Sequence, residues 1–397
     1  MIKHLFKLVW NRKRSNFLLM LEVFASFLIL FFVVTLGVYF ADNYRQPLGF
    51  SYDNVWHLST GRQGSDDIWV PEDATTLEQV ILAIKSNEEV EGVAGVHTPP
   101  YGFGNRSSVN EYNGREVAME VNEVTDEFKD VMGLQLAAGR WFGKEDDGMN
   151  WHPLVINQRM AREWYGAEDP VNKKFEPWSQ DGAEYRVIGV VTDFRKDGEF
   201  AGLINYVFDR RRLGDPERRP PRDLVIKVRP GTTVAFEERL LTKLQEIAKQ
   251  WSFEAELLSQ AREFSLKLRL GFVFGVGLVA VFLMLMVGLG LVGVLWQNVT
   301  QRTKEIGLRR AKGATAGDIH RQILGELLVL TSFGLILGVV LVIQFPLLDL
   351  IGFISTKVYI RGLLVSLVII YGLTIAAGLY PSWLATKVQP AEALHYE

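Results

Sequence analysis

Residue types that carry enzymatic chemistry are sparse in this chain and form no recognisable catalytic arrangement. The sequence has no G-x-x-x-x-G-K-[ST] segment, so it lacks the loop with which P-loop proteins hold nucleotide phosphates. It has no G-x-S-x-G or H-E-x-x-H segment, and it has no cysteine to form disulfides or thiolate ligands. The six histidines are scattered, which is typical of structural or surface residues. We therefore expect no catalytic site, no metal site and no cofactor bound by this chain.

The most distinctive chemistry lies in a basic stretch, residues 301–321, between two long apolar runs. Its arginines and lysines are interrupted by Ile306 and Leu308. Such a composition suits either anionic lipid headgroups or the docking of a soluble protein. The residues by themselves leave both alternatives open.

The middle of this basic stretch carries the signals of a chain break followed by a helix. Gly307 and Gly313 allow tight turns or a close approach by another backbone. Thr315 and Asp318 have the spacing of a capping box, in which each side chain bonds to the other residue's backbone N–H. A new helix should therefore begin directly after Thr315.

Four apolar runs are long enough to cross a bilayer, which takes about 20 apolar residues per helix. The predicted spans are residues 17–40, 266–298, 323–346 and 362–384. The first run exceeds the about 7 to 15 apolar residues of a signal peptide, and no A-x-A site follows it, so we interpret it as an anchor. Glu22 within it either snorkels to the interface or contacts another helix.

The charges predict how the chain is oriented in the membrane. Residues 41–264 contain 27 Lys and Arg against 39 Asp and Glu, whereas the rest of the chain contains 16 against 7. Because basic residues favour the cytoplasmic side, both termini and the basic stretch should be cytoplasmic. The predicted cytoplasmic segments are residues 1–16, 299–322 and 385–397, and residues 347–361 form a short loop on the opposite side.

Residues 41–265 are predicted to form a mixed α/β domain outside the cytoplasm. Helix signals cover residues 73–84, with Asp73 as the expected cap, and residues 158–165 and 235–250. Strand signals cover residues 117–121, 153–156, 185–192 and 224–228. This alternation is typical of small αβ subdomains.

An arginine-rich and proline-rich loop, residues 209–222, lies within the predicted α/β domain. Its simpler interpretation is a solvated loop. The alternative is contact with anionic lipid or a partner protein.

Two motifs in the second half of the chain resemble those of a known family. The run Arg302-Thr-Lys-Glu-Ile-Gly-Leu-Arg-Arg-Ala-Lys-Gly-Ala-Thr315 resembles the R-x-x-E-I-G-[IL]-x-[KR]-A-x-G-A loop of FtsX-like permease domains. The run from Tyr380 to Leu394 resembles the closing Y-P-A-x-x-A-x-x-x-P-x-E-A-L motif of the same domains. Residues 139–142, 155–157 and 187–194 are similar to segments of MacB-type periplasmic core domains. The chain is thus similar to ABC transporter permeases of the MacB/FtsX kind.

This resemblance implies an integral membrane α-helical protein with four transmembrane helices and a large mixed α/β extracytoplasmic domain between helices 1 and 2. It implies a multi-pass protein of the bacterial inner membrane whose outer domain is periplasmic and stands on a stalk formed by spans one and two. It also implies a permease subunit that moves this domain for export or extraction of a substrate. The alternative is an FtsX-like signalling or scaffold protein that regulates a periplasmic hydrolase.

The resemblance further implies that ATP and Mg are bound by a separate ABC ATPase, because MacB carries its ATPase before the first span and this chain starts almost at that span. The other implied partners are a second permease copy or a related permease, membrane lipids and a periplasmic adaptor, whereas nucleic acid is not expected. In the family the basic loop docks as a coupling helix into the ATPase. The residues assigned to this contact are Arg302, Lys304, Glu305, Ile306, Gly307, Leu308, Arg309, Arg310, Lys312, Gly313, Ala314, Thr315, Asp318 and Ile319.

Overall fold

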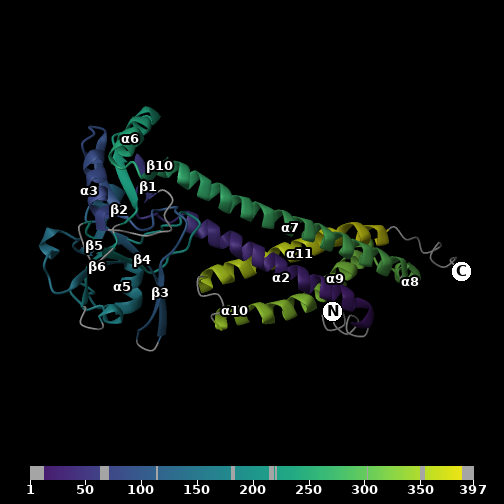
Figure 1. Ribbon diagram of the computed structural model, residues 1–397. Helices are drawn as coiled ribbons and strands as arrows, with labels where there is room; N and C mark the ends of the chain where they lie inside the picture. Colours follow the sequence, from purple (N-terminus) through teal and green to yellow (C-terminus); the bar gives the residue numbers. More distant parts are fainter. Residues whose placement is uncertain are drawn as a thin grey trace. The chain divides into compact units, whose positions relative to one another are not determined.

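The computed structural model describes residues 13–62, 71–112, 115–179, 184–213, 219, 221–301, 303–348 and 354–386. The chain divides into two compact units (Figure 1). The sheet unit is Asn43–Arg269, and the helical unit is Met1–Asp42 together with Leu270–Glu397. The boundary between them falls inside two long helices, α2 and α7, so each of these helices is covalently continuous from one unit into the other.

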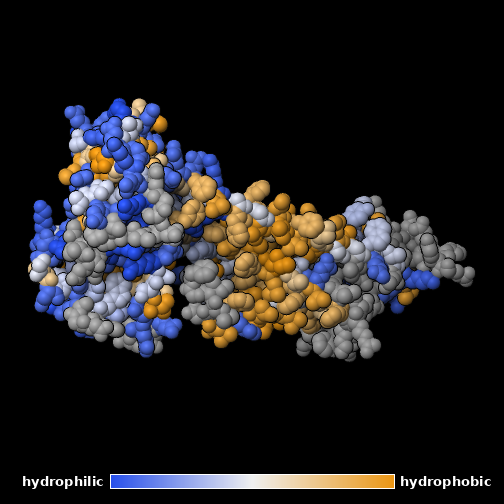
Figure 2. All heavy atoms as spheres, viewed as in Figure 1, coloured by the Kyte–Doolittle hydropathy of each residue, from blue (hydrophilic) through white to orange (hydrophobic). Residues whose placement is uncertain are grey.

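Helices occupy all four of the predicted spans. The helices are α2 (Lys13–Tyr44), α7 (Leu258–Gln301), α8 (Thr303–Ala311), α9 (Ala316–Val342), α10 (Gln344–Leu347) and α11 (Thr356–Thr386). Within the described residues, four segments are long and apolar enough to cross a membrane: Met20–Tyr44, Leu258–Gly290, Ala316–Leu347 and Thr356–Leu384. Hydrophobic residues dominate the surface of the helical unit in Figure 2, as expected for a surface that faces lipid.

Two of the predicted loops are partly helical. The described part of residues 299–322 contains the end of α7, all of α8 and the start of α9. The expected loop at residues 347–361 ends early, because α11 already begins at Thr356. In both places helical hydrogen bonds extend beyond the apolar run, because the bounds of a helix are not set by the bounds of its apolar residues.

Glycines bring three helices of the helical unit into close contact. A Cβ atom built on Gly338 of α9 would lie 2.4 Å from Cδ1 of Phe27 in α2, and one on Gly334 would lie 2.9 Å from the Met20 carbonyl oxygen. A Cβ on Gly362 of α11 would lie 2.2 Å from the Thr35 hydroxyl. These glycines therefore let helices approach closely within one chain, as small residues do in membrane helices.

Two glycines of α7, which have the same spacing of four residues as Gly334 and Gly338, behave differently. Cβ atoms built on Gly271 and Gly275 of α7 would meet nothing within 4 Å. Further along α7, a Cβ on Gly290 would lie 2.1 Å from Oε1 of Glu22 in α2. The structure therefore favours the interpretation of Glu22 as a contact with another helix.

The sheet unit contains one ten-stranded mixed sheet. Its strands are β1 (Val55–Arg62), β2 (Val90–Val96), β3 (Ser107–Tyr112), β4 (Arg115–Val124), β5 (Leu136–Gly139), β6 (His152–Asn157), β7 (Tyr185–Val191), β8 (Tyr206–Arg210), β9 (Asp223–Val228) and β10 (Trp251–Leu257). The order is β10-β1-β9-β2-β4-β8-β6-β7-β5, and β3 pairs with β4. The pairs β4 with β8 and β6 with β7 are parallel.

Four helices of the sheet unit are α3 (Pro71–Lys85), α4 (Phe128–Met132), α5 (Gln158–Tyr165) and α6 (Val234–Ile247). The expected cap at Asp73 is wrong, because α3 already begins at Pro71 and Asp73 lies in its first turn. There its charge is still favourable, since a helix N-terminus carries partial positive charge. Helix α6 ends before Gln250, because the chain must become extended to enter β10 at Trp251.

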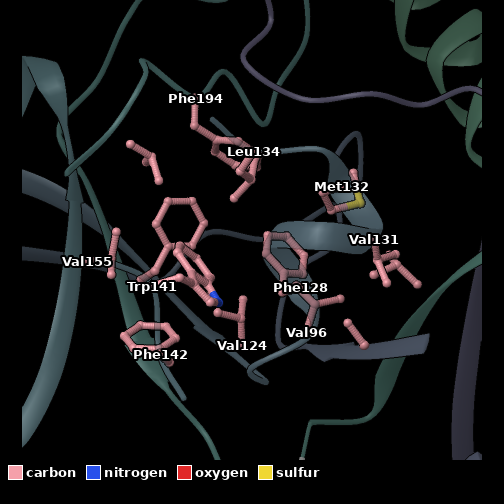
Figure 3. Close-up of a cluster of buried hydrophobic side chains, with 14 of the residues drawn as sticks. Val96, Val124, Phe128, Val131, Met132, Leu134, Trp141, Phe142, Val155 and Phe194 are labelled. Carbon is pink, nitrogen blue, oxygen red and sulfur yellow. The ribbon is translucent and has the colours of Figure 1, made fainter. Parts of the chain in front are cut away.

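The sheet has two halves, each with its own helices. Helices α3 and α6 bury their apolar faces with β1, β2 and β9 in one hydrophobic cluster, and α5 packs with β6 and β7 in another. The halves join where Val96 of β2 pairs with Val124 of β4. A third cluster at this junction contains Phe128, Trp141 and Phe194 (Figure 3). The predicted αβ subdomains are therefore halves of one sheet that share a core.

A cross-strand ionic group stabilises the first half of the sheet. His57 Nε2 lies 2.7 Å from Asp223 Oδ1, and His57 Nδ1 lies 3.3 Å from Glu256 Oε1. Burial by itself lowers the pKa of His57, but the hydrogen bonds and charges of Asp223 and Glu256 outweigh burial and raise this pKa. The ring therefore favours its charged form, which links three neighbouring strands.

Replacing His57 by glutamine should destabilise the sheet unit more at low pH than at high pH. A folded-state pKa above the ordinary value of 6.5 gives stability that is fully present below that value and is lost as pH rises through the folded pKa. We expect a loss of about 1 kcal/mol at pH 6, since the group is partly exposed, and a smaller loss at pH 8.5. Thermal unfolding of the full chain in detergent measures this difference. Asp223→Asn should reduce the same pH dependence, because only Glu256 would remain to raise the pKa of His57, and a loss that is independent of pH would contradict the assignment.

Replacing Gly338 by leucine should disrupt the packing of α9 on α2. The new side chain would overlap Phe27, and overpacking of this kind costs about 1 to 3 kcal/mol. Thermal stability and size-exclusion profiles in detergent report the effect. The matched control is Gly275→Leu, which meets open space and should behave like the wild type. Equal thermal stability of the two variants would show that the contact between α9 and α2 does not contribute to the stability of the protein.

Candidate coupling site

The basic stretch forms a helix, a turn and a second helix in the helical unit. Helix α8 ends at Ala311, and Gly313 follows with a positive φ of 95°. The Gly313 N–H donates to the Arg310 carbonyl and the Ala314 N–H to the Arg309 carbonyl, which together form a Schellman motif. The break predicted at Gly313 is therefore present. Of the two alternatives for Gly307, a tight turn is excluded, because this residue lies inside α8 and is buried.

The predicted capping box starts helix α9. The Asp318 N–H donates to the Thr315 hydroxyl at 3.2 Å, and the Thr315 N–H donates to Asp318 Oδ2 at 3.0 Å. Two backbone donors that would otherwise lack partners at the helix start are satisfied in this way. The angle between α8 and α9 is thus fixed by a glycine turn on one side and a capping box on the other.

One face of α8 is held against its own chain. Ile306 is buried against Ile319 of α9 in a small hydrophobic cluster. The Arg309 guanidinium donates to Glu305 Oε1 at 2.6 Å and also to the Gln322 amide oxygen. This face therefore combines an apolar contact with charge-assisted hydrogen bonds.

Arg310 connects α8 to the last helix of the chain. Its guanidinium donates to the carbonyl oxygen of Thr386, near the end of α11. The carbonyl groups at a helix C-terminus have no partner within the helix, and a cation is favourable there. Arg310 thereby ties α8 and α11 together across a long separation in sequence.

The opposite face of α8 is exposed. Lys304, Leu308 and Ala311 follow one another at helical spacing, and Lys312 lies beside them at the turn. Leu308 is a large apolar side chain that remains 49% exposed. An apolar residue flanked by lysines on an exposed helix face suits contact either with a docking protein or with anionic lipid headgroups. We call Lys304, Leu308, Ala311 and Lys312 the exposed face of α8.

The structure divides the residues assigned to the coupling site into two groups. Those held against the chain itself are Ile306, Gly307, Arg309, Arg310 and Ile319. Those that are exposed are Lys304, Glu305, Leu308, Lys312, Gly313, Thr315 and Asp318, and Ala314 is half-buried. Arg302 lies outside the described residues. Their contact with an ATPase stays a prediction.

Gln322 and Thr386 belong to this site but were not predicted from the sequence. Gln322 receives the Arg309 hydrogen bond, and its own amide donates to Glu326 Oε1 at 2.9 Å. The spacing of Gln322 and Glu326 by one helical turn was a usable signal. The role of Thr386 had no local signal, because it acts through its backbone carbonyl.

A second group of contacts, centred on Arg195, lies in the sheet unit beside the ends of α2 and α7. Arg195 is 1% exposed. Its Nη1 donates to the carbonyls of Asn43 at 2.7 Å and Gln46 at 3.1 Å. Its Nη2 donates to the carbonyls of Glu199, at 2.6 Å, and Ala201. The guanidinium therefore joins the end of α2 to the loop of residues 195–201.

The first turns of α7 contact the same loop. Arg262 of α7 pairs with the Glu199 carboxylate, and its guanidinium carbon lies 4.7 Å from the centre of the Tyr52 ring. On the α2 side, the Tyr44 and Phe200 rings stack with centres 5.5 Å apart. Both long helices are therefore fastened to one loop, which we call the 195–201 junction.

Two family matches together cover most of the chain. Residues 17–243 match the MacB-like periplasmic core domain, which accounts for more than half of the sequence. Residues 277–390 match the FtsX-like permease C-terminal domain. The order of the two matches agrees with the sheet unit and the last three long helices.

Similar proteins include several ABC transporter permeases. The ABC transporter permease YvrN of Bacillus subtilis strain 168 is 25% identical over 430 residues, covering 100% of both chains. The macrolide export ATP-binding/permease protein MacB of Bdellovibrio bacteriovorus is 28% identical over 280 residues, which are 65% of this chain but only 41% of that protein. The periplasmic region of MacB from Actinobacillus actinomycetemcomitans has 16% identity and a TM-score of 0.36, covering 53% of this chain and 92% of that one.

The predicted resemblance is thus confirmed by matches to both halves of the chain. The four long apolar helices fit a membrane protein, and the sheet unit inserted after the first of them fits an extracytoplasmic domain. This chain belongs to the MacB/FtsX-like family of ABC transporter permeases.

Proposed function

We propose that this permease transmits ATP-driven motion from a separate ATPase to its extracytoplasmic sheet unit, for export or extraction of a substrate. The observation that carries the proposal is the two-sided character of α8. One face is fastened to α9 and α11, and the other presents Leu308 between lysines. A force applied to the exposed face would therefore move packed helices instead of a flexible loop.

The proposed partner is a cytoplasmic ABC ATPase dimer that binds ATP and Mg and receives the exposed face of α8. In this arrangement α8 and both termini are cytoplasmic in a bacterial inner membrane, as the distribution of basic residues predicts. A second copy of the chain or a related permease would occupy the other ATPase subunit. Membrane lipids surround the helices, and a periplasmic adaptor is a further proposed partner.

The proposed transmission path runs through α7. This helix continues without interruption from Leu258 to Gln301, and α8 begins two residues later. At its other end α7 is tied by Arg262 to the 195–201 junction, where Arg195 also holds the end of α2. A shift of α7 relative to α2 would therefore act on a single rigid loop of the sheet unit.

Replacing Leu308 by glutamate should weaken recruitment of the ATPase without unfolding the permease. A buried charge replacing an apolar anchor at an interface costs about 2 kcal/mol, or roughly 30-fold in affinity. The amount of ATPase that co-purifies with the tagged chain from its native membrane measures this loss. Leu308 is a sharper test than Arg309 and Arg310, because both arginines also hold α8 to its own chain.

The matched control for Leu308→Glu is Val234→Glu, the same kind of change at an exposed apolar residue of the sheet unit. This control should recover as much ATPase as the wild type. Normal recovery by Leu308→Glu, with membrane insertion intact, would show that α8 does not dock the ATPase.

Replacing Arg195 by methionine should break transmission while leaving recruitment intact. Four backbone carbonyls would lose their donor inside the sheet unit, which we expect to cost roughly 3 kcal/mol. In the wild type, ATP should change hydrogen exchange of residues 43–46 and 198–201, and in the variant this response should be lost. Arg212→Met removes an exposed arginine and should keep the response. An unchanged response in Arg195→Met would exclude the junction from the path.

A further inference from the structure

The sheet unit contains a cavity that the proposed transmission does not use. Its volume is about 870 Å³, and its lining includes Arg106, Arg211, Arg219 and Arg222 together with Trp178 and Tyr185. A cavity of this size is in the range of small-molecule sites, about 300 to 1,000 Å³. Three of these arginines come from the arginine-rich segment, residues 209–222, whose role the sequence left open.

Other arginines of the same segment have structural partners. The Arg210 guanidinium donates to both oxygens of Asp126, at 2.7 and 2.6 Å, and to Asp147 at 2.9 Å. Arg212 lies 3.6 Å from Asp147 on the surface. The segment is therefore not a uniformly solvated loop. Some of its arginines form ion pairs outside the cavity, and others line the cavity wall.

Arg211 is the most buried arginine of the cavity wall. It is 6% exposed, and its Nη2 pairs with the Glu123 carboxylate, which Arg106 also contacts. Burial raises the pKa of Glu123, but the two arginines outweigh burial and lower it, so the carboxylate stays charged. Among the described residues, Nε and Nη1 of Arg211 are buried without a hydrogen-bond partner. Buried donors of this kind are uncommon and require an acceptor.

The charges of the lining favour an anion. Four guanidinium groups face three carboxylates, those of Glu123, Asp209 and Asp223. Asp223 is also engaged by His57 at 2.7 Å, and Glu123 is shared between two arginines. Among the described lining residues, guanidinium groups therefore outnumber carboxylates, and arginine is the side chain best suited to bind carboxylate or phosphate oxygens in pairs.

We propose that this cavity binds a small organic oxyanion, with its carboxylate or phosphate group held by the arginines and an apolar or aromatic part against Trp178 and Tyr185. The ligand supplies acceptors to the arginine cluster and fills a space much larger than a single ion. Its aromatic part contacts ring surfaces that the sheet unit already exposes to the cavity. The site lies entirely within the sheet unit, so binding does not depend on the ATPase.

The test measures binding of phenyl phosphate to the full chain in detergent by titration calorimetry, at constant ionic strength. Inorganic phosphate and chloride serve as comparison anions. We expect saturable binding at one site, tighter for phenyl phosphate than for phosphate and not measurable for chloride. Tighter binding of the phenyl ester reports the aromatic contact, which general attraction to a positive surface does not produce.

Two exposed arginines of the wall provide the variants, because removal of the buried Arg211 would leave Glu123 with only the exposed Arg106 as a partner. Arg106→Ala and Arg222→Ala should each weaken phenyl phosphate binding about tenfold, as expected for loss of one charge-assisted contact. Arg212→Ala removes the same charge from the same segment outside the lining and should bind like the wild type.

Equal weakening by all three arginine variants would reduce the effect to net charge and overturn the proposal. The proposal would also be overturned if phenyl phosphate did not bind, or if it bound only in the presence of vesicles that contain phosphatidylglycerol. Neither result bears on ATPase recruitment by Leu308, so failure of this inference is distinguishable from failure of the proposed function.

Discussion

A buried guanidinium, that of Arg195, is the interaction on which the 195–201 junction of the sheet unit depends. A cation removed from water is stable only if its donors find acceptors, and here four backbone carbonyls accept from the two Nη groups. One of these carbonyls belongs to Asn43 at the end of α2 and one to Gln46 just beyond it, and the other two belong to the loop that Arg262 of α7 contacts through Glu199. Lysine could not replace Arg195, because a single ammonium group cannot reach all four oxygens in this planar arrangement.

In the helical unit, close packing between apolar helices likewise depends on a few specific contacts. Gly334, Gly338 and Gly362 let α9 and α11 lie close to α2, so side chains interlock where lipid offers no hydrophobic driving force. At the end of this bundle, Arg310 ties α8 to α11 while Leu308 stays exposed. A bundle packed in this way has few intermediate arrangements, which the proposed transmission would require.

Elements with strong local signals were predictable. Helix α5 begins and ends as expected because Asn157 caps it, with its side-chain oxygen 3.1 Å from the Met160 N–H, and Gly166 follows it. Strand β7 was found through its run of β-branched residues. Strands β1, β2, β3, β5, β8 and β10 were missed, because their hydrophobic patterns are weaker and most of them are stabilised by pairing with distant strands.

The sequence by itself determined the four apolar helices, the acidic insertion, the turn at Gly313 and the family, because each depends on composition or on residues close in the chain. Tertiary structure decided which glycines touch, which residues of α8 face outward, and which arginines line a cavity. Gly271 and Gly338 look alike in sequence, and so do Arg211 and Arg212. The residues of each pair differ only in which distant side chains lie near them. Packing and charge pairing join residues that are far apart in the sequence, so no periodic sequence pattern reveals them.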